Sequence, residues 1–462
     1  MLEGLHKIVS TEDTIAAIST PVGQAGIGVI RMSGSEVRSI TGRFFRPFRA
    51  FRDFHHREAI VGRCFAPNGE LLDEVVVTYF QAPHSYTGED VVEISGHGNP
   101  QVLRRLLDSA CTSGARLARP GEFTLRAVAH GKMDLLQAEA VREFIEAQTE
   151  TQTRTALRQM GGSLSKRIRP VKERLLGVIA HLEAGIDFAE DDVVIPANAA
   201  VSADIQPLRD DLITLRDSFG YGRIVSNGLR VAILGKPNVG KSSLFNRLLS
   251  ADRAIVTEIP GTTRDVLTET ISIDGVPLRL ADTAGVRETA DRVESLGVTR
   301  TLETLSEADL AIVVLDGSNE LDTDDGEVLD KTSLIPHLIV INKSDLPVKM
   351  DGSVLNGARR VSCSARTGEG LDNLHEEIRS FLLSRRTECA EEWILTSERQ
   401  YDAISKALSA LATACEGLES RVPHEMILLD LYRGLGALGE LTGEVVTEDI
   451  LDRIFSSFCI GK

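Results

Sequence analysis

The stretch RVAILGKPNVGKSS, residues 230–243, decides the fold of the segment around it. An apolar run leads into a glycine-rich turn, and an amphipathic helix follows. Backbone N–H groups in such a turn can surround phosphate oxygens, and the helix directs the positive end of its dipole at them. Lys241 is expected to reach the outer phosphates and Ser242 to bind magnesium. The flanking strand and helix favour a P-loop in an α/β domain over a chance glycine-rich turn.

The tetrapeptide Asn342-Lys343-Ser344-Asp345, which follows another apolar run, predicts that the base is guanine. The Asp345 carboxylate can accept hydrogen bonds from N1–H and from the exocyclic amine of guanine, a pair that adenine lacks. Unpaired polar groups in such a site penalise the wrong base by roughly 10⁴-fold. Ser364 and Ala365 are placed to support the base from the other side. GTP is therefore the expected nucleotide.

Two further motifs complete a predicted GTP hydrolysis site. In the run from Asp282 to Gly285, Asp282 is expected to hold magnesium through water and the Gly285 amide to sense the γ-phosphate. The segment 261–265 fits the first switch, with Thr263 on magnesium. The expected nucleotide contacts are Asn238, Val239, Gly240, Lys241, Ser242, Ser243, Thr257, Thr263, Asp282, Thr283, Ala284, Gly285, Asn342, Lys343, Asp345, Ser364 and Ala365.

The residue that aligns the attacking water is not where many GTPases have it. Many carry a glutamine directly after the Asp-Thr-Ala-Gly motif, whereas this chain has Val286 there. A hydrophobic side chain cannot align water. The nearby acids Glu288, Asp291 and Glu294 are the candidates for that role.

Length and composition predict a soluble cytoplasmic protein with several domains. The chain has 462 residues, which suggests roughly three domains, and no apolar run approaches the roughly 20 residues that a membrane span requires. Residues 1–20 carry acids and do not resemble a secretion signal. The net charge of −17 argues against general affinity for nucleic acid. The six cysteines are scattered without a C-x-x-C pair.

The pattern along the chain predicts three parts. Short strands (14–18, 28–32, 73–79, 90–94) and a helix over 101–111 indicate an α+β domain. Helices follow over 134–161, from about 164, and over 200–219, and Gly220-Tyr221-Gly222 is expected to be a hinge before an α/β region from Leu229 to about Leu383. Helical periodicity returns from Thr396. We expect a Ras-like G domain inserted into a discontinuous all-α domain, with boundaries 1–127, 128–225, 226–384 and 385–462.

Three stretches leave alternatives open. Arginines and phenylalanines alternate over residues 43–57, which fits base stacking but better fits phenylalanines on the domain and arginines in water. Residues 86–98 are rich in carboxylates and glycines and form a ligand site or, as we favour, a turn between two strands. Residues 151–175 carry many bases and form an RNA-binding face or, again favoured, a solvated helix face.

Over its whole length the sequence resembles the MnmE (TrmE) family of tRNA-modifying GTPases. The C-terminal run FSSFCIGK, residues 455–462, matches the terminal signature of that family. Residues 86–90 (YTGED), 119–123 (RPGEF) and 132–135 (KMDL), and the insertion of the G domain, support the resemblance.

The resemblance implies specific sites. The N-terminal domain, residues 1–127, is called the front domain below. It is expected to bind a tetrahydrofolate one-carbon donor (5,10-methylene- or 5-formyl-tetrahydrofolate) and to form a homodimer. The matching folate positions are Arg31, Glu93, Lys132 and Lys462. A potassium ion is expected to replace an arginine finger, and Glu294 to activate water. The potassium ligands implied are Asn238, Thr257, Ile259 and Thr262.

The resemblance also implies partners and a reaction. With the FAD-containing flavoprotein MnmG, in a heterotetramer or larger complex, such a protein adds an aminomethyl or carboxymethylaminomethyl group at C5 of the tRNA wobble uridine. Cys459 matches the terminal cysteine of the family, with either direct participation in this chemistry or a structural or redox role. A ribosome-assembly or signalling GTPase is the alternative, and a folate enzyme regulated by GTP is a weaker one. No membrane partner is expected.

Overall fold

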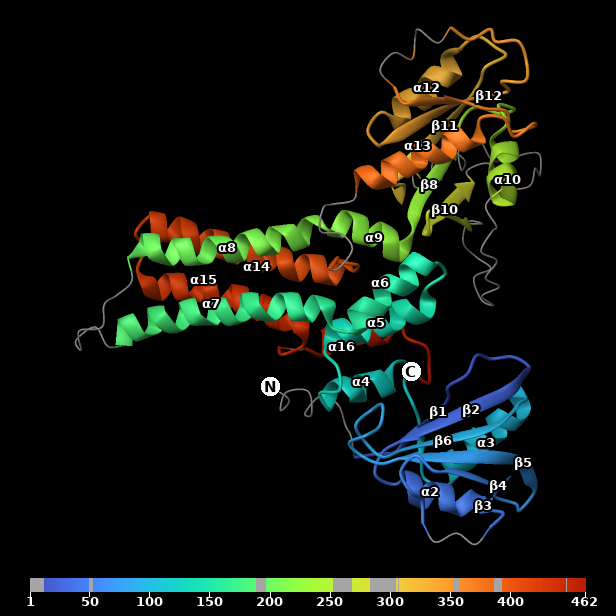
Figure 1. The fold of residues 1–462 in the computed structure, drawn as a ribbon, viewed down its shortest axis with the longest axis vertical. Coiled ribbons are helices and arrows are strands. Elements are labelled where there is room, and N and C mark those ends of the chain that lie inside the picture. The colour runs from blue at the N-terminus through green and yellow to red at the C-terminus, as the bar shows by residue number, and fades with distance from the viewer. Residues whose placement is uncertain are drawn as a thin grey trace. The chain divides into compact units, whose positions relative to one another are not determined.

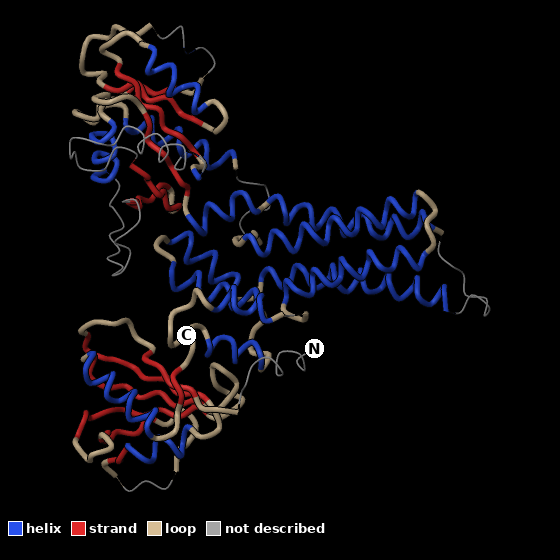
Figure 2. The backbone as a smooth tube through the Cα atoms, turned by 180° about the vertical axis from the view of Figure 1, so that it is seen from behind, coloured by secondary structure: helices blue, strands red, loops and turns tan. Residues whose placement is uncertain are grey.

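The computed structural model describes residues 12–49, 53–187, 197–251, 268–282, 307–351, 358–385, 393–445 and 447–462, together with Leu305 and Leu355. The chain divides into two compact units. The first comprises residues 1–142, 159–209 and 403–462, and the second comprises residues 143–158 and 210–402. Figures 1 and 2 show the helices and strands of each unit. The four domain boundaries stay a prediction.

The front of the first unit is an α+β fold built on a seven-stranded sheet with the order β3-β4-β5-β6-β2-β1-β7. The expected short strands and the helix near residue 101 are confirmed. Two helices, α2 and α3, pack against each other and against the sheet (Figure 1). The elements are β1 (Ile15–Ile18), β2 (Ala25–Ser33), α2 (Val37–Phe44), β3 (Phe45–Pro47), β4 (Ala59–Phe65), β5 (Leu71–Phe80), β6 (Val91–Gly98), α3 (Pro100–Thr112) and β7 (Arg116–Leu117).

The two faces of this sheet are chemically different because side chains alternate along a strand. Ile30 of β2 and Ile94 of β6 are fully buried in the core with α2 and α3. Their neighbours Arg31 and Glu93 occupy directly paired positions on the opposite face. Asn99 caps α3 by accepting from the Gln101 amide. The sheet therefore keeps one apolar face for its helices and presents a charged pair on the other.

The helix expected over residues 134–161 is two helices, α5 (Leu135–Glu146) and α6 (Glu150–Met160). The chain breaks at Thr149, whose hydroxyl accepts from the Gln152 amide. The Gln152 side chain accepts from the Thr149 amide in return. Such a reciprocal cap favours the start of a new helix. The single-helix expectation was wrong because Thr149 and Gln152 cap a second helix within the expected range.

The remaining helices range from 8 to 25 residues in length. Those expected from about residue 164, over 200–219 and from Thr396 are confirmed, whereas the helix over residues 122–129 was not expected. In the first unit α7 packs against α15. Lys172 of α7, which is 8% exposed, forms an ion pair of 2.5 Å with Glu444 just after α15. The elements are α4 (Glu122–Ala129), α7 (Ser163–Asp187), α8 (Asn198–Asp217), α9 (Phe219–Asn227), α14 (Glu398–Glu419), α15 (His424–Thr442) and α16 (Glu448–Phe455).

The glycines expected to form a hinge at residues 220–222 lie inside helix α9. Gly222 allows the backbone of Leu395 to come close, because a Cβ atom at position 222 would lie 2.2 Å from the Leu395 carbonyl oxygen. The Leu395 amide donates to the buried Ser218 hydroxyl at 3.1 Å. The hinge expectation was therefore wrong, because the glycine makes room for a neighbouring backbone rather than for a bend.

The second unit contains the expected α/β fold, a six-stranded sheet with the order β13-β12-β11-β8-β10-β9. The strands are parallel except β9, which pairs antiparallel with β10. Every residue of β11 is buried, as in a parallel strand covered on both faces. The elements are β8 (Leu229–Leu234), α10 (Lys241–Ala251), β9 (Thr268–Ile273), β10 (Val276–Asp282), β11 (Leu310–Asp316), α12 (Thr323–Thr332), β12 (His337–Asn342), β13 (Arg360–Ser362) and α13 (Leu371–Ser384).

The arginine and phenylalanine stretch at residues 43–57 mostly follows the favoured interpretation. Phe45 and Phe54 are 3% and 7% exposed and belong to the core of the front sheet. Phe48 is 51% exposed, with the Arg63 guanidinium 5.1 Å from its ring centre. Phe51 lies outside the described residues. Among the residues that the structure describes, no helix is long and apolar enough to cross a membrane.

Candidate functional site

The P-loop lies at the carboxyl end of the central strand β8, where the chain turns into α10. Asn238 has a φ of 65°, a left-handed conformation that asparagine tolerates better than most residues. Lys241 folds back over the loop, and its Nζ atom donates to the carbonyls of Gly235 and Lys236 at 2.8 Å each. The Ser242 side chain at the start of α10 is exposed. These features fit a phosphate and a magnesium ion at the helix N-terminus.

The guanine-binding motif is joined to the P-loop by one buried side chain. Asn342, at the end of β12, is 2% exposed. Its Nδ2 atom donates to the Val239 carbonyl at 2.8 Å, and its Oδ1 atom accepts from the Ala365 amide at 2.9 Å. Asn342 therefore fixes the phosphate loop and the loop after β13 relative to each other.

The Asp345 carboxylate is oriented before any base binds. Its Oδ1 atom accepts from the Ser364 hydroxyl at 2.6 Å. This hydrogen bond is the main cause that holds the pKa of Asp345 below its usual range, and the Arg366 charge adds to it. Lys343, with a φ of 65°, forms an ion pair of 2.7 Å with Asp316 at the end of β11. The residues expected to read guanine thus meet at one edge of the sheet.

Only part of the predicted hydrolysis machinery lies in the described structure. Asp282 ends β10 at the position paired with Ile233 of β8, so it lies beside the strand that leads into the P-loop. Both switch segments lie outside the described residues, and the roles assigned there stay predictions. The predicted site residues concerned are Thr257, Ile259, Thr262, Thr263, Thr283, Ala284, Gly285 and Glu294.

A second cluster of predicted site residues forms on the charged face of the front sheet. Arg31 donates to Glu93 from Nε and Nη2 at 2.9 and 2.7 Å. The Arg31 guanidinium lies 5.3 Å from the ring centre of Tyr86 and 5.8 Å from that of Phe123. Burial and the Arg31 charge lower the pKa of Lys462, against a smaller opposing effect of Glu93. Three of the four predicted folate positions therefore meet around two aromatic rings.

The C-terminal residues are held against this face by backbone contacts. The Phe123 amide donates to the Lys462 carbonyl at 3.2 Å, and the Ser19 hydroxyl donates to the Gly461 carbonyl at 3.1 Å. Gly461 has a φ of 100°, and a Cβ atom on it would lie 2.4 Å from the Ile18 carbonyl oxygen. Only glycine fits there. A residue from the last position of the chain is thereby brought to strands from its beginning.

Lys132, the fourth predicted folate position, contacts the loop that carries Tyr86. Its Nζ atom donates to the Pro83 carbonyl at 3.0 Å. Its Cδ atom lies 3.5 Å from where a Cβ atom of Gly88 would be. Cys459, the predicted reactive cysteine, is exposed. Its carbonyl accepts from the Gly121 amide at 3.5 Å, next to the helix that carries Phe123.

Sequence reasoning missed the two aromatic neighbours of Arg31 and a buried ion network beside them. The aromatic residues, Tyr86 and Phe123, both occur in the motifs that carried the family resemblance, which was the available signal. The network forms because Arg126, with a fully buried side chain, binds Glu89 at 3.1 Å and Glu122 at 3.2 Å. Glu89 is thus a structural residue. The expectation of a turn between two strands holds only for the part of residues 86–98 that precedes Val91, because Val91–Gly98 is strand β6.

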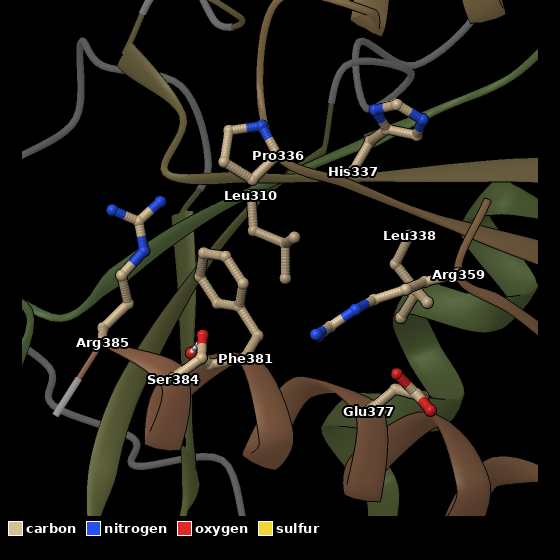
Figure 3. Close-up of a pocket in the computed structure, with 9 residues that line it drawn as sticks. All are labelled: Leu310, Pro336, His337, Leu338, Arg359, Glu377, Phe381, Ser384 and Arg385. Carbon is tan, nitrogen blue, oxygen red and sulfur yellow. Dashed lines mark hydrogen bonds between the residues drawn. The ribbon is translucent and has the colours of Figure 1, made fainter. Parts of the chain in front are cut away.

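A hollow of about 310 Å³ lies elsewhere in the second unit (Figure 3). It is lined by Leu310, Pro336, His337, Leu338, Arg359, Glu377, Phe381, Ser384 and Arg385. Leu310 and His337 begin β11 and β12, so the hollow is at the edge of the sheet opposite to the P-loop. It is not the nucleotide site. Among the described residues, no group of three or more His, Cys, Asp or Glu side chains is arranged to hold a metal.

Matches to known proteins cover nearly the whole chain. Residues 135–459 match the family model described as the MnmE helical domain, and residues 14–132 match that of the GTP-binding protein TrmE N-terminus. The tRNA modification GTPase MnmE of Koribacter versatilis is 47% identical, covering 98% of this chain and 100% of the relative. The protein of the same name from Aquifex aeolicus is 44% identical, covering 97% and 100%.

Several solved structures of GTP-binding proteins match part of the chain. The crystal structure of the G domain of the T. maritima FeoB iron transporter is 29% identical and covers 33% of this chain and 98% of that one, with a TM-score of 0.26.

Proposed function

Because the chain belongs to the MnmE family of tRNA modification GTPases, we propose that it modifies C5 of the tRNA wobble uridine with a tetrahydrofolate donor and the FAD-containing partner MnmG. The product carries an aminomethyl or carboxymethylaminomethyl group. The observation that carries this proposal is the second site, in which Arg31 and Glu93 meet the C-terminal Lys462. A ribosome-assembly or signalling GTPase requires the nucleotide site but does not require the second site.

The chemistry of the second site supports a folate ligand. A tetrahydrofolate carries a bicyclic ring system with N–H donors, of which the pyrimidine ring is flat, and a glutamate tail with carboxylates. Glu93 can accept from ring N–H groups, and the cations Arg31 and Lys462 can bind carboxylate oxygens. Tyr86 and Phe123 offer ring faces beside them. When bound, the tetrahydrofolate derivative supplies the one-carbon unit.

Burial of the Lys462 amine supports a further role within this site. Its lowered pKa, caused by burial and by Arg31, makes the neutral form more accessible than in a surface lysine. In its neutral form a lysine amine can accept a proton from a bound ligand. Lys132 holds the loop that carries Tyr86, and Cys459 is exposed at the start of the tail. We assign Lys132 to positioning and leave Cys459 to either uridine chemistry or a structural role.

The hydrolysis step uses the P-loop of the second unit. Ser242, Thr263 and Asp282 are proposed to hold magnesium, directly or through water, and Glu294 to activate the attacking water. Asn238, Thr257, Ile259 and Thr262 are proposed to hold potassium when two G domains meet in the homodimer. The exposed side chain and left-handed backbone of Asn238 support a cation ligand at that position. A tRNA substrate also agrees with the cytoplasmic location expected from the sequence.

Replacing potassium by sodium is expected to slow GTP hydrolysis by at least about tenfold, since an ion in the place of an arginine finger stabilises transition-state charge. The measurement is the turnover rate at saturating GTP in equal concentrations of KCl and NaCl. Asn238→Ala should have low turnover in both salts. Equal rates of the wild-type protein in the two salts would rule out the potassium site, while leaving the folate proposal untouched.

The experiment that tests the proposed function is mass spectrometry of wobble uridines in tRNA from cells that lack this protein. We expect the C5 group to be absent and to return with the wild-type gene. Arg31→Met should not restore it and should weaken binding of a tetrahydrofolate by at least about tenfold, because a charged hydrogen-bonding partner is lost. The matched control is Arg105→Met, which removes an exposed arginine paired with Glu70 in the same domain.

Each result of this experiment separates the alternatives. Normal wobble uridines without the protein would favour the ribosome-assembly or signalling interpretation. Modified tRNA with Arg31→Met would mean that the cluster around Arg31 is not the donor site. Loss of modification with Arg105→Met as well would attribute the effect to damage of the domain rather than to the site.

A further inference from the structure

Lys236, the second residue of the P-loop, is joined to a helix that the sequence motifs do not connect to nucleotide binding. Its Nζ atom donates to Asp322 Oδ2 at 2.6 Å and to Asp325 Oδ2 at 2.8 Å. Both carboxylates lie at the N-terminus of α12. The Lys236 side chain is 16% exposed and that of Asp325 is 4% exposed. The pair with Asp325 is therefore largely covered, whereas Asp322 is 52% exposed.

The two aspartates are themselves fixed by the start of α12. Asp322 accepts from the Asp325 amide at 3.1 Å, and Asp325 accepts from the Asp322 amide at 3.2 Å, which forms a reciprocal cap. The hydrogen bonds from Lys236 to both residues raise the pKa of Lys236. The same interaction lowers the pKa of Asp322. At neutral pH the contact therefore holds one cation between two carboxylates on a rigid helix end.

The backbone of Lys236 connects this contact to the phosphate-binding lysine. The Lys236 carbonyl accepts from Lys241 Nζ at 2.8 Å. Two residues further on, Asn238 adopts a left-handed backbone conformation, which is uncommon for a residue other than glycine. Lys236 thus contacts α12 through its side chain, and it contacts Lys241 through its main-chain carbonyl.

We propose that Lys236 is a positioning residue for GTP binding, whose side chain anchors the P-loop to the N-terminus of α12. The anchor holds the loop in its phosphate-binding shape before nucleotide arrives. Less ordering is then needed on binding, which increases affinity. The anchor acts on GDP and GTP alike because it does not touch the phosphates. The inference concerns nucleotide binding and is independent of the folate and tRNA proposals.

Two other possible roles of Lys236 predict different results. If Lys236 left α12 to bind the γ-phosphate, its loss would weaken GTP more than GDP. If it only stabilised the fold, its loss would lower unfolding stability without changing the affinity of the folded protein. An anchor requires that removing the carboxylates has the same effect as removing the lysine.

The test is the dissociation constant of full-length protein for GDP and for GTP in five variants. These are Lys236→Met, Lys236→Arg, the double variant Asp322→Asn with Asp325→Asn, the combination of Lys236→Met with that double variant, and Lys331→Met. Asparagine can still cap α12, so the double variant removes the charges and keeps the helix end. Lys331→Met is the matched control, because Lys331 lies on the same helix in an exposed pair with Glu327 at 3.4 Å.

We expect Lys236→Met and the double aspartate variant each to raise both dissociation constants about tenfold, with turnover at saturating GTP within about twofold. Combining them should add little, since they remove one contact. Lys236→Arg should restore most of the affinity, and Lys331→Met should match wild type. Wild-type affinity of Lys236→Met, or a loss confined to GTP and absent from the double variant, would overturn the proposal. If Lys236→Met does not fold, the double variant decides alone.

Discussion

Replacing Asp345 by asparagine is expected to lower the affinity for GTP by at least about 100-fold and to create affinity for xanthosine triphosphate. The carboxylate accepts two hydrogen bonds from guanine, whereas an amide presents an N–H group to the guanine amine. Sites built to hydrogen-bond a ligand penalise such a mismatch by several orders of magnitude. In xanthine a carbonyl replaces that amine, so the amide of the variant regains both hydrogen bonds. The measurement is the dissociation constant for the two nucleotides.

The surroundings of Asp345 explain why the change should act on specificity rather than on folding. Asparagine has the same shape, and the Ser364 hydroxyl at 2.6 Å can still orient it. The matched control is Asp274→Asn, since Asp274 pairs with Arg379 in the same unit and is half-exposed. It should bind GTP as wild type does. A preference for GTP over xanthosine triphosphate that is unchanged in Asp345→Asn would mean that another group reads the base.

The residues predicted to form the nucleotide site follow strands that end at one edge of a parallel sheet. Asp345 and Ser364 come after β12 and β13, and the P-loop comes after β8, so their meeting follows from the topology. The spacing of the motifs does not predict which neighbour each side chain contacts. The anchor from Lys236 to Asp322 crosses 86 positions and carries no motif. The same holds for Asn342, which binds a carbonyl 103 positions away.

In the front domain, too, the sequence predicts which face of a strand a residue lies on but not which distant residue it pairs with. Alternation along β2 and β6 indicates that Arg31 and Glu93 lie on the face away from Ile30 and Ile94, but not that they are neighbours. Their pairing depends on the register of two strands, and the arrival of Lys462 depends on the path of the whole chain. Family resemblance supplied these positions. The errors at Thr149 and Gly222 were local, and a capping pair and a close backbone contact account for them.

Arg126→Met is expected to lower the unfolding free energy of the front domain by about 3 kcal/mol. The Arg126 side chain is fully buried and binds Asp13 at 2.5 Å, Glu89 at 3.1 Å and Glu122 at 3.2 Å. Methionine has a similar length but leaves Glu89 and Glu122, which are 8% and 7% exposed, with one cation fewer. Removing one partner of a buried ion network costs roughly 3–5 kcal/mol, and Arg116 still pairs with Glu122 at 2.7 Å.

The loss is best measured by hydrogen exchange at the amides of β2 and β6, because the one tryptophan of the chain, Trp393, lies in the other compact unit. Arg63→Met is the matched control. Its partner Glu74 is about half exposed, so the change should stay within about 0.5 kcal/mol. Protection in Arg126→Met equal to that in Arg63→Met would show that the network contributes no stability.

The pH dependence of this loss follows from the carboxylates. Burial opposes ionisation of Asp13 and Glu122, but hydrogen bonds from the arginines outweigh it and lower the pKa of both groups. A lowered folded-state pKa means that the stabilisation is complete above the unfolded values of 3.8 and 4.5 and is lost as pH falls through the folded values. Below about pH 4.5 the wild-type protein therefore loses the stabilisation from these ion pairs, which Arg126→Met already lacks. The difference between the two proteins should shrink on acidification, and a difference that grows would contradict this assignment of the charges.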